Sequence, residues 1–274
     1  MEILKKEILT DINSRIIKLK IYAPYICQKA EPGQFVVLMV KKEGERIPLT
    51  IVEKDKKEES IILIFQEIGL TTKLLGKLRK GNKLVSLLGP LGNPTEIKKY
   101  GKVILVGGGI GIAEIYPVAK ALKKKDNYLV AVLGARTKKL LILEKELKEI
   151  CDQVFITTDD GSYERKGVVT DVLRETIKKE KFSLVYAVGS LGMMEKVSII
   201  TKKFKTKTIV SLNTLMIDAT GMCGCCRVYL NKEVKFACVD GPEFDAHYID
   251  WENLRQRNKT YEDREKSILK FYHL

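Results

Sequence analysis

The sequence predicts an antiparallel β-barrel, then an α/β domain with a parallel sheet, and then a short segment rich in cysteine. Three observations predict this order. Short β-type segments divided by turn residues fill residues 1–97. Buried apolar runs then alternate with helical patterns in residues 98–210. Finally, four of the six cysteines fall within the 16 residues that end at Cys238.

The composition is that of a globular protein. The chain has 274 residues, 45% of them hydrophobic, which is enough for two domains with separate apolar cores. No stretch approaches the roughly 18 to 20 apolar residues of a membrane helix, and the first residues alternate like a strand instead of forming the apolar block of a signal peptide. We therefore expect a cytoplasmic protein with no membrane partner.

The charge balance is strongly basic, at a formal +14, which would attract an acidic partner. The basic residues are scattered along the chain and form no nucleic-acid-binding signature, so we expect no nucleic-acid partner. A lysine-rich composition is equally typical of an organism with a hot habitat or a biased genome.

The barrel is predicted from five β-type segments and one helix. The segments are residues 15–22, 35–40, 49–54, 61–66 and 83–88. Turn residues such as Pro32-Gly33 and Gly81-Asn82 separate them, and this spacing is typical of a small antiparallel barrel. The helix is expected at residues 71–79, where an apolar stripe follows Thr71 and Thr72, which suit an N-cap.

The second domain is predicted from strands that alternate with helices, a pattern typical of a parallel sheet covered on both faces. The expected strands are residues 103–106, 129–133, 154–157 and 184–188, and the expected helices are residues 114–125, 144–150, 169–179 and 193–204. A charged amphipathic helix is expected over residues 251–272. The domains we expect are residues 1–97, 98–210, 211–250 and 251–274.

A glycine-rich loop follows the first strand of the α/β domain. Glycines there let the backbone approach a pyrophosphate, and the next helix offers free N–H groups to it. The match to the dinucleotide fingerprint is imperfect, because Ile112 stands where a glycine is expected. A tight turn without a ligand therefore stays open as an alternative. The candidate nucleotide-binding residues are Gly108, Gly109, Gly111 and Ile112.

An acidic pair, Asp159 and Asp160, follows the third strand of this domain at its ligand-binding edge. A carboxylate there could accept hydrogen bonds from a ribose and would repel a 2′-phosphate, which favours NADH over NADPH. Arg136, Lys138 and Lys139 follow the second strand and could instead hold that phosphate.

The cysteine-rich segment predicts a metal site, because clustered cysteines without a secretion signal favour metal over disulfides. Two residues separate Cys223 from Cys226, so that one turn can aim both sulfurs at one metal centre. A hairpin at residues 228–236 would return Cys238 to the same place. Three thiolates are thus assembled and one ligand is missing. A structural zinc site and buried cysteines without a metal stay open.

Three segments carry a family resemblance: GGGIGIAEIYPVAKAL, TTDDGSYERKGVVTDVL and the cysteine-rich segment that contains DATGMCGCCRV and FACVDGPEFD. Together with the order of the domains, they resemble the ferredoxin-NADP reductase superfamily and, within it, the electron-transfer subunits of dihydroorotate dehydrogenase. They are more similar still to the small subunits of NADH-dependent ferredoxin-NADP oxidoreductases, also described as sulfide dehydrogenases. The resemblance covers nearly the whole chain.

The resemblance implies a [2Fe-2S] cluster and supplies the missing ligand. The dihydroorotate-type subunits have a cysteine five residues before the first cysteine of the pair, where this chain has Asp218. The implied ligands are Asp218, Cys223, Cys226 and Cys238, and Cys225 is a spare that points away because neighbours on an extended chain face opposite ways.

The resemblance also implies a site for FAD on the barrel. The superfamily places an Arg-x-x-Ser/Thr stretch beside the flavin; here Thr50 matches it, whereas Arg46 sits one residue early. A helix start with two hydroxyls suits a pyrophosphate independently of any family. The candidate residues are Arg46, Ile47, Pro48, Leu49, Thr50, Ile64, Phe65, Gln66, Gly69, Thr71 and Thr72.

The function implied is electron transfer between NAD(H), FAD and a [2Fe-2S] cluster, on to a larger partner subunit that carries flavin and iron-sulfur groups, and indirectly to ferredoxin. Electron bifurcation by the complex is part of this expectation. No side chain needs to act as an acid or base, so we expect no catalytic residue. The alternatives are a dihydroorotate dehydrogenase electron-transfer subunit and a non-catalytic, zinc-bearing NAD-binding protein.

Overall fold

The computed structural model describes residues 1–12 and 14–272, and the chain forms two compact units, each built from separate stretches of sequence. Unit 1 comprises Met1–Pro94, Asn213–Pro242 and Asp250–Leu274. Unit 2 comprises Thr95–Leu212 and Glu243–Ile249. The cysteine-rich segment therefore belongs to the same unit as the predicted barrel.

Unit 1 contains the predicted antiparallel barrel. Its described strands are β1 (Ile3–Thr10), β2 (Ile16–Tyr22), β3 (Phe35–Met39), β4 (Arg46–Asp55), β5 (Ser60–Gln66) and β6 (Ser86–Leu91), in the order β1-β2-β5-β4-β3-β6. The sheet closes on itself where Glu2 bridges to Lys83, beside a bond from the Leu84 N–H to the Met1 carbonyl at 2.9 Å. Closure leaves β1 and β6 without a long open edge.

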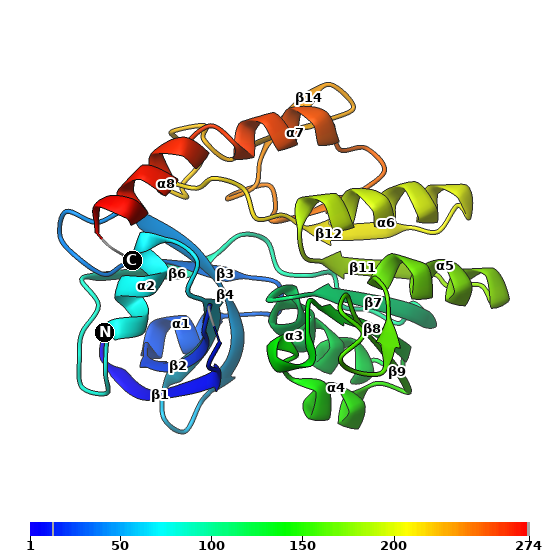
Figure 1. The fold of residues 1–274 in the computed structure, drawn as a ribbon, viewed down its shortest axis with the longest axis horizontal. Coiled ribbons are helices and arrows are strands. Elements are labelled where there is room, and N and C mark those ends of the chain that lie inside the picture. The colour runs from blue at the N-terminus through cyan, green and yellow to red at the C-terminus, as the bar shows by residue number, and fades with distance from the viewer. Residues whose placement is uncertain (13, 273–274) are drawn as a thin grey trace. The chain divides into compact units, whose positions relative to one another are not determined.

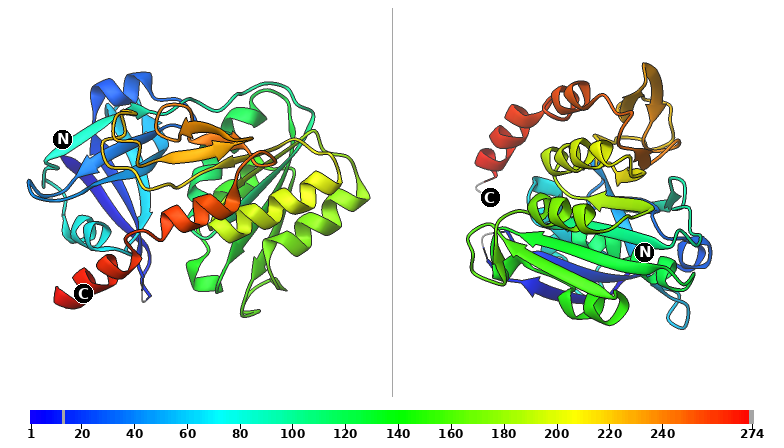
Figure 2. Two further views of the ribbon diagram at one scale, coloured as in Figure 1. Left: turned by 90° about the horizontal axis from the view of Figure 1, so that it is seen from above. Right: turned by 90° about the vertical axis from the view of Figure 1, so that its right-hand side faces the viewer.

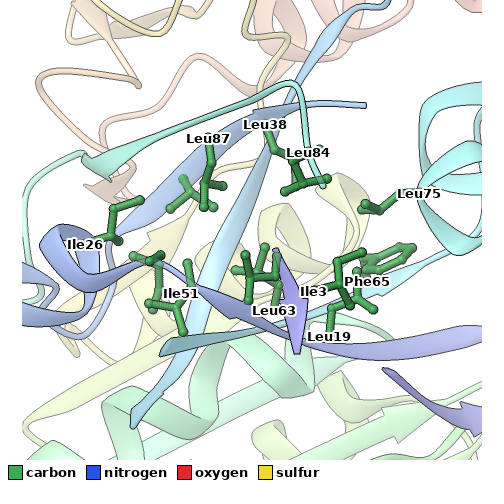
Figure 3. Packing of buried hydrophobic residues seen from close by; sticks show 14 of the residues in the cluster. Ile3, Leu19, Ile26, Leu38, Ile51, Leu63, Phe65, Leu75, Leu84 and Leu87 are labelled. Carbon is green, nitrogen blue, oxygen red and sulfur yellow. The ribbon is translucent and has the colours of Figure 1, made fainter. Parts of the chain in front are cut away.

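Apolar side chains from all six of these strands fill the barrel (Figure 3). On β2 the buried Ile17, Leu19 and Ile21 alternate with lysines, because successive side chains of a strand face opposite ways. Two helices close the barrel: α1 (Pro24–Lys29), which the sequence analysis did not predict, and α2 (Leu70–Lys77), which buries Leu75.

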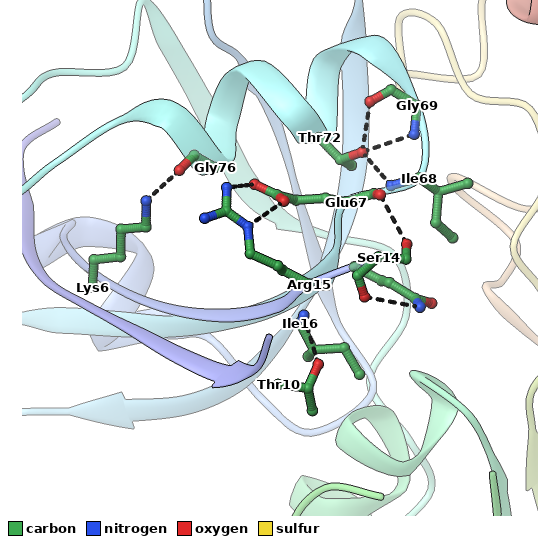
Figure 4. A network of polar contacts seen from close by, with 11 residues as sticks. Lys6, Thr10, Ser14, Arg15, Ile16, Glu67, Ile68, Gly69, Thr72 and Gly76 are labelled. Carbon is green, nitrogen blue, oxygen red and sulfur yellow. Dashed lines mark hydrogen bonds and ion pairs between the residues drawn. The ribbon is translucent and has the colours of Figure 1, made fainter. Parts of the chain in front are cut away.

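An ion pair fixes the segment that leads into α2. The Arg15 guanidinium donates two hydrogen bonds to the Glu67 carboxylate, from Nε at 2.7 Å and from Nη2 at 2.8 Å (Figure 4). Glu67 is almost fully buried, so the paired guanidinium offsets the cost of burying its charge. The helix starts earlier than predicted, and its N-cap is Gly69 rather than a threonine.

Unit 2 contains the predicted sheet covered on both faces. Its described strands are β7 (Lys102–Gly108), β8 (Tyr128–Ala135), β9 (Gln153–Thr158), β10 (Arg165–Lys166), β11 (Leu184–Val188), β12 (Thr208–Ser211) and β15 (Glu243–Asp245), in the order β10-β9-β8-β7-β11-β12-β15. All neighbours are parallel except β12 and β15. The strand order reverses at β7, so the carboxyl ends of β7 and β11 form the crevice where such sheets bind ligands.

Helices cover both faces of this sheet, with α3 and α4 on one side and α5 and α6 on the other (Figure 1). They are α3 (Gly111–Lys123), α4 (Glu144–Ile150), α5 (Val169–Lys179) and α6 (Leu191–Lys203), with a 3₁₀ turn η1 (Lys138–Leu140). The sequence analysis missed β10, β12 and β15. A hydrogen bond from the Tyr186 hydroxyl to the Glu243 carboxylate, at 2.6 Å, anchors β15.

The remainder of unit 1 is a hairpin of β13 (Arg227–Leu230) and β14 (Glu233–Phe236), followed by α7 (Trp251–Asn258) and α8 (Glu262–Phe271). The prediction of one helix over residues 251–272 is wrong, because the helix is interrupted between the end of α7 and the start of α8 (Figure 2). The Thr260 hydroxyl donates to the Arg257 carbonyl at 2.7 Å and satisfies one acceptor at the end of α7. Of the helices in the described residues, none combines the length and the apolar character that crossing a membrane requires.

Candidate functional site

The hairpin β13–β14 brings Cys238 back to Cys226, as the spacing predicts. Both side chains are buried, and their sulfurs lie 3.2 Å apart. The Ala237 N–H donates to the Cys226 carbonyl at 3.0 Å and holds this pair in register. All six cysteines lie in the described part of the chain, and all are free thiols. Burial raises the pKa of Cys238 to about 12, so this thiol remains protonated at neutral pH unless a metal displaces the proton.

Asp218 and Cys223 form a second pair. The Asp218 carboxylate accepts the Cys223 N–H at 2.8 Å and the Thr220 N–H at 3.0 Å, one on each oxygen. The hydrogen bond from Thr220, with that from Cys223, lowers the pKa of Asp218, so its carboxyl is ionised at neutral pH. Each oxygen keeps a further lone pair for a metal, since an ionised carboxylate has about four acceptor sites.

This donor set fits a two-iron cluster. A [2Fe-2S] cluster takes four protein ligands, so that each iron takes two, and the four predicted ligands form two pairs. A structural zinc ion instead needs four ligands around one centre. Within residues 1–12 and 14–272, no three His, Cys, Asp or Glu side chains are gathered closely enough to hold a single metal ion. Two pairs of donors, one pair for each iron, fit a two-iron cluster.

Cys225 lies in a turn and not on an extended chain, so the reason given for its pointing away is wrong. Its side chain is half-buried, with the sulfur 4.0 Å from the Cys223 carbonyl oxygen. Its own carbonyl accepts a hydrogen bond from Arg257 Nη2 at 3.0 Å. The sequence analysis missed Arg257, because no short-range pattern connects α7 with the cysteines.

The candidate flavin residues on the barrel lie on β4 and β5. On β4, Arg46 is exposed, and the four residues after it, which pair with β3, are half-buried. On β5, Ile64 and Phe65 face opposite ways. The Phe65 side chain belongs to the barrel core, so only its backbone is open to a ligand. The Gln66 side chain donates to the Ser14 carbonyl at 3.4 Å.

The start of α2 uses its two threonines differently. The Thr72 hydroxyl accepts the N–H groups of Ile68 and Gly69, both at 3.0 Å, and thereby caps the helix (Figure 4). The Thr71 hydroxyl is buried and donates to the Glu45 carboxylate at 2.5 Å. Only Thr71 therefore has a hydroxyl that the helix cap does not use.

The glycine loop connects β7 to α3, as predicted. Gly109 has a left-handed backbone with φ of +58°, and no atom lies within 4 Å of where a Cβ would be, so its side is open to a ligand. At Gly111 a Cβ would lie 2.3 Å from the Val188 carbonyl oxygen, so internal packing alone requires a glycine. The Ile112 side chain is fully buried, which leaves its backbone as the part that could meet a nucleotide.

The acidic pair and the basic residues lie on two loops that bond to each other. The Asp160 carboxylate accepts the Ser162 N–H at 2.9 Å, and hydrogen bonding from Ser162 lowers the pKa of Asp160. The Ser162 hydroxyl in turn accepts the Lys138 N–H at 2.8 Å. The Lys138 ammonium lies 4.2 Å from the centre of the Tyr163 ring. Both aspartates are exposed, and the Asp160 carboxylate shapes its own loop.

Two family models match this chain. Residues 105–198 match an oxidoreductase NAD-binding domain, and residues 213–250 match the iron-sulfur cluster binding domain of dihydroorotate dehydrogenase B. The first spans the glycine loop and the acidic pair, and the second spans both ligand pairs. Fold and site together define an oxidoreductase of the ferredoxin reductase type with an iron-sulfur segment.

Whole-chain comparisons identify the family. A homologue of the dihydroorotate dehydrogenase B (NAD⁺) electron-transfer subunit from Thermotoga maritima is 45% identical over 97% of this chain and 93% of its own length. The electron-transfer subunit itself, from a Geobacillus species, is 33% identical over 89% of this chain and 98% of its own. The chain therefore belongs to the family of dihydroorotate dehydrogenase B electron-transfer subunits and their homologues.

A solved structure confirms the closer resemblance. A chain of NADH-dependent reduced ferredoxin-NADP oxidoreductase, studied for flavin-based electron bifurcation, matches with a TM-score of 0.93 and 42% identity. The match covers 100% of this chain and 98% of that one. The cytochrome P450 reductase GcoB of Amycolatopsis shares the fold at a TM-score of 0.61 and 22% identity, over 74% of this chain and 64% of its own.

Proposed function

We propose that this chain is the electron-transfer subunit of an NADH-dependent ferredoxin-NADP oxidoreductase. It uses NAD(H), FAD and a [2Fe-2S] cluster, and it passes electrons to a larger partner subunit and through it to ferredoxin, as part of a bifurcating complex. The observation that carries this proposal is that Asp218 is hydrogen-bonded to Cys223 and that the sulfurs of Cys226 and Cys238 lie 3.2 Å apart, which provides four donors for two irons.

The residues of this chain bind and orient the cofactors. Flavin supplies the conversion between the paired electrons of a nicotinamide and the single electrons of an iron-sulfur cluster. The loop at Gly109 and the exposed Asp159 are our proposed contacts for pyrophosphate and ribose. The half-buried part of β4 and the start of α2 are our proposed contacts for FAD. Asp218 and the three cysteines hold the irons.

These roles divide the chain by cofactor rather than by compact unit. The proposed parts are residues 1–97 for FAD, 98–210 for NAD(H), 211–250 for the cluster and 251–274 as a C-terminal helical region. We place the protein in the cytoplasm, since no described helix could cross a membrane and its proposed electron partner, ferredoxin, is a small soluble carrier.

A dihydroorotate dehydrogenase subunit is the second candidate, favoured by the names of several relatives. The carboxylate of Asp218 argues against it, because the resemblance gives those subunits a cysteine at this position. Purification of the native complex separates the two functions. Dihydroorotate should leave the flavin of the complex oxidised if the proposal is right, and should bleach it if the second candidate is right.

We expect the purified protein to be coloured and to be reduced faster by NADH than by NADPH. Flavin bands with an iron-sulfur shoulder should appear in the visible spectrum, whereas a zinc protein would be colourless.

The exposed Asp159 should repel a 2′-phosphate, so we expect kcat/KM for flavin reduction to favour NADH by at least about tenfold. Stopped-flow reduction with each nucleotide measures this, and an equal or reversed preference would refute the assignment.

We expect Thr71→Val to weaken flavin binding and leave iron unchanged. The hydroxyl has one proton, which it donates to Glu45 in this structure, and we expect it to turn to the phosphate when flavin binds. Loss of that hydrogen bond to a charged phosphate costs about 1.5–3 kcal/mol, or roughly a tenfold to hundredfold rise in the flavin Kd. Thr72→Val is a poorer probe, because it also removes the cap of α2. Glu45→Gln is the matched control: it alters the partner of Thr71 while keeping the hydroxyl. Flavin loss in Glu45→Gln but not in Thr71→Val would show that the hydroxyl does not meet the phosphate.

A further inference from the structure

Hydrogen bonds join both ends of helix α7 to the cysteine-rich segment and to the residues before it. At its start the Asp250 N–H donates to the Tyr229 carbonyl at 2.9 Å. At its end the Asn258 side chain donates to the Asn213 carbonyl at 3.2 Å. Between them, Leu254 is buried. The helix therefore forms a rigid backing for the loops that carry the candidate ligands.

Arg257 extends from this helix to the cysteine loop. Its Nη2 donates to the Cys225 carbonyl at 3.0 Å, and the same peptide group continues into the N–H of Cys226. A full positive charge is thus held about one peptide unit from a proposed ligand. Arginine keeps this charge at any physiological pH.

One N–H donor of the Arg257 guanidinium has no hydrogen-bond partner among the described residues. This donor, Nε, is buried; Asn253 Oδ1, one turn earlier on α7, is also buried and has no partner in the described part of the chain. Leaving a buried polar group without a partner costs about 1–3 kcal/mol, and more for a charged group. Such a group calls for a physical explanation. The hydrogen bond to the Cys225 carbonyl does not by itself explain why position 257 has a charged arginine.

We propose that Arg257 is a positioning residue for the iron-sulfur cluster, which fixes the cysteine loop and raises the reduction potential of the cluster through its charge. This inference rests on the proposed function. The cluster gains one electron and the flavin loses it, so the cluster becomes more negative by one charge. A fixed cation nearby stabilises that reduced form, since net charge and hydrogen bonding set cluster potentials.

The test is a redox titration followed by EPR on the full chain, with iron content measured for every sample. Arg257→Gln keeps a donor for the Cys225 carbonyl but removes the charge. We expect it to favour the oxidised cluster tenfold, a shift of about 59 mV to lower potential for one electron. Arg257→Lys keeps the charge and should retain most of the wild-type potential.

Arg255→Gln is the matched control. Like Arg257→Gln, it removes one positive charge from α7. Arg255 is exposed, and because it is two residues from Arg257 its side chain lies on a different face of the helix. We expect its shift to be less than about a third of that of Arg257→Gln, because solvent screens exposed charges.

The outcomes separate the two proposals. Arg257→Gln with full iron content and the wild-type potential overturns the role of Arg257, as does an equal shift in Arg255→Gln. If Arg257→Gln does not keep its iron, the measurement on Arg257→Lys tests the role of the charge. A wild-type reduction potential in Arg257→Lys supports that role. A tenfold shift of the cluster equilibrium at full iron content contradicts it. A wild-type protein without an iron-sulfur EPR signal would instead overturn the proposed function.

Discussion

Replacing Asp218 with alanine is expected to strip most of the iron from the protein. Changes around metal ligands typically cost about 10- to 100-fold in metal affinity, and loss of a ligand itself should exceed that. Asp218→Cys should keep the cluster but alter its potential and its EPR g-values, because a thiolate replaces a harder oxygen ligand. Iron analysis and EPR on the purified variants measure both effects.

Two controls distinguish a ligand from a loop cap, since Asp218 also accepts two backbone N–H groups. The first is Asp218→Cys, which removes both acceptors of the loop but keeps a metal ligand. If Asp218 only shaped the loop, Asp218→Cys should lose its iron; if Asp218 is a ligand, Asp218→Cys should keep it. Cys225→Ser should leave iron and spectrum nearly unchanged. Should Cys225→Ser abolish the cluster while Asp218→Ala spares it, the ligands would be Cys223, Cys225, Cys226 and Cys238.

Gly111→Ala is expected to abolish reduction of the flavin by NADH. The new methyl group would lie 2.3 Å from the Val188 carbonyl oxygen and 2.9 Å from the Gly189 nitrogen, both backbone atoms that cannot turn aside. The start of α3 must therefore move away from β11. Overpacking of this kind costs about 1–3 kcal/mol, and a displacement of about 1 Å at a reacting site can cost roughly a hundredfold in rate.

Gly192→Ala is the matched control, because a methyl group on that α6 glycine would meet no atom within 4 Å. It should unfold at or slightly above the wild-type temperature and be reduced normally. Thermal unfolding and stopped-flow reduction measure the pair. Flavin and iron should remain in Gly111→Ala, since the proposed sites for both lie in unit 1. Normal reduction of Gly111→Ala would show that the loop can shift without affecting the nucleotide.

The sequence predicted the parts of the fold that strong local patterns specify. Helices α4 and α5 have the predicted bounds, because apolar positions recur at helical spacing between clear breaks. The six-residue α1 is too short for such a period, although its proline at the first helical position was a signal. The strand β15 is three residues long, and its pairing with β12 depends on tertiary contacts that no local pattern contains.

The candidate site divides in the same way. The hairpin that joins Cys226 to Cys238 was predictable, since turn residues and spacing determine it. The separate uses of Thr71 and Thr72 were not, because the choice of N-cap depends on how residues 67–69 enter the helix. Arg257 was not predictable either: its contact with the Cys225 carbonyl exists only once α7 has packed against the hairpin.

The discontinuity of unit 1 imposes an order on biosynthesis. A ribosome produces the barrel first, then Thr95–Leu212, and only afterwards the segment from Asn213 that completes the first unit. At roughly 5–20 residues per second, the barrel waits on the order of ten seconds for that segment. The nucleotide domain has meanwhile emerged almost entire, lacking only its edge strand β15. Iron can therefore be inserted only after Cys238 has been made, by which time the flavin could already be in place.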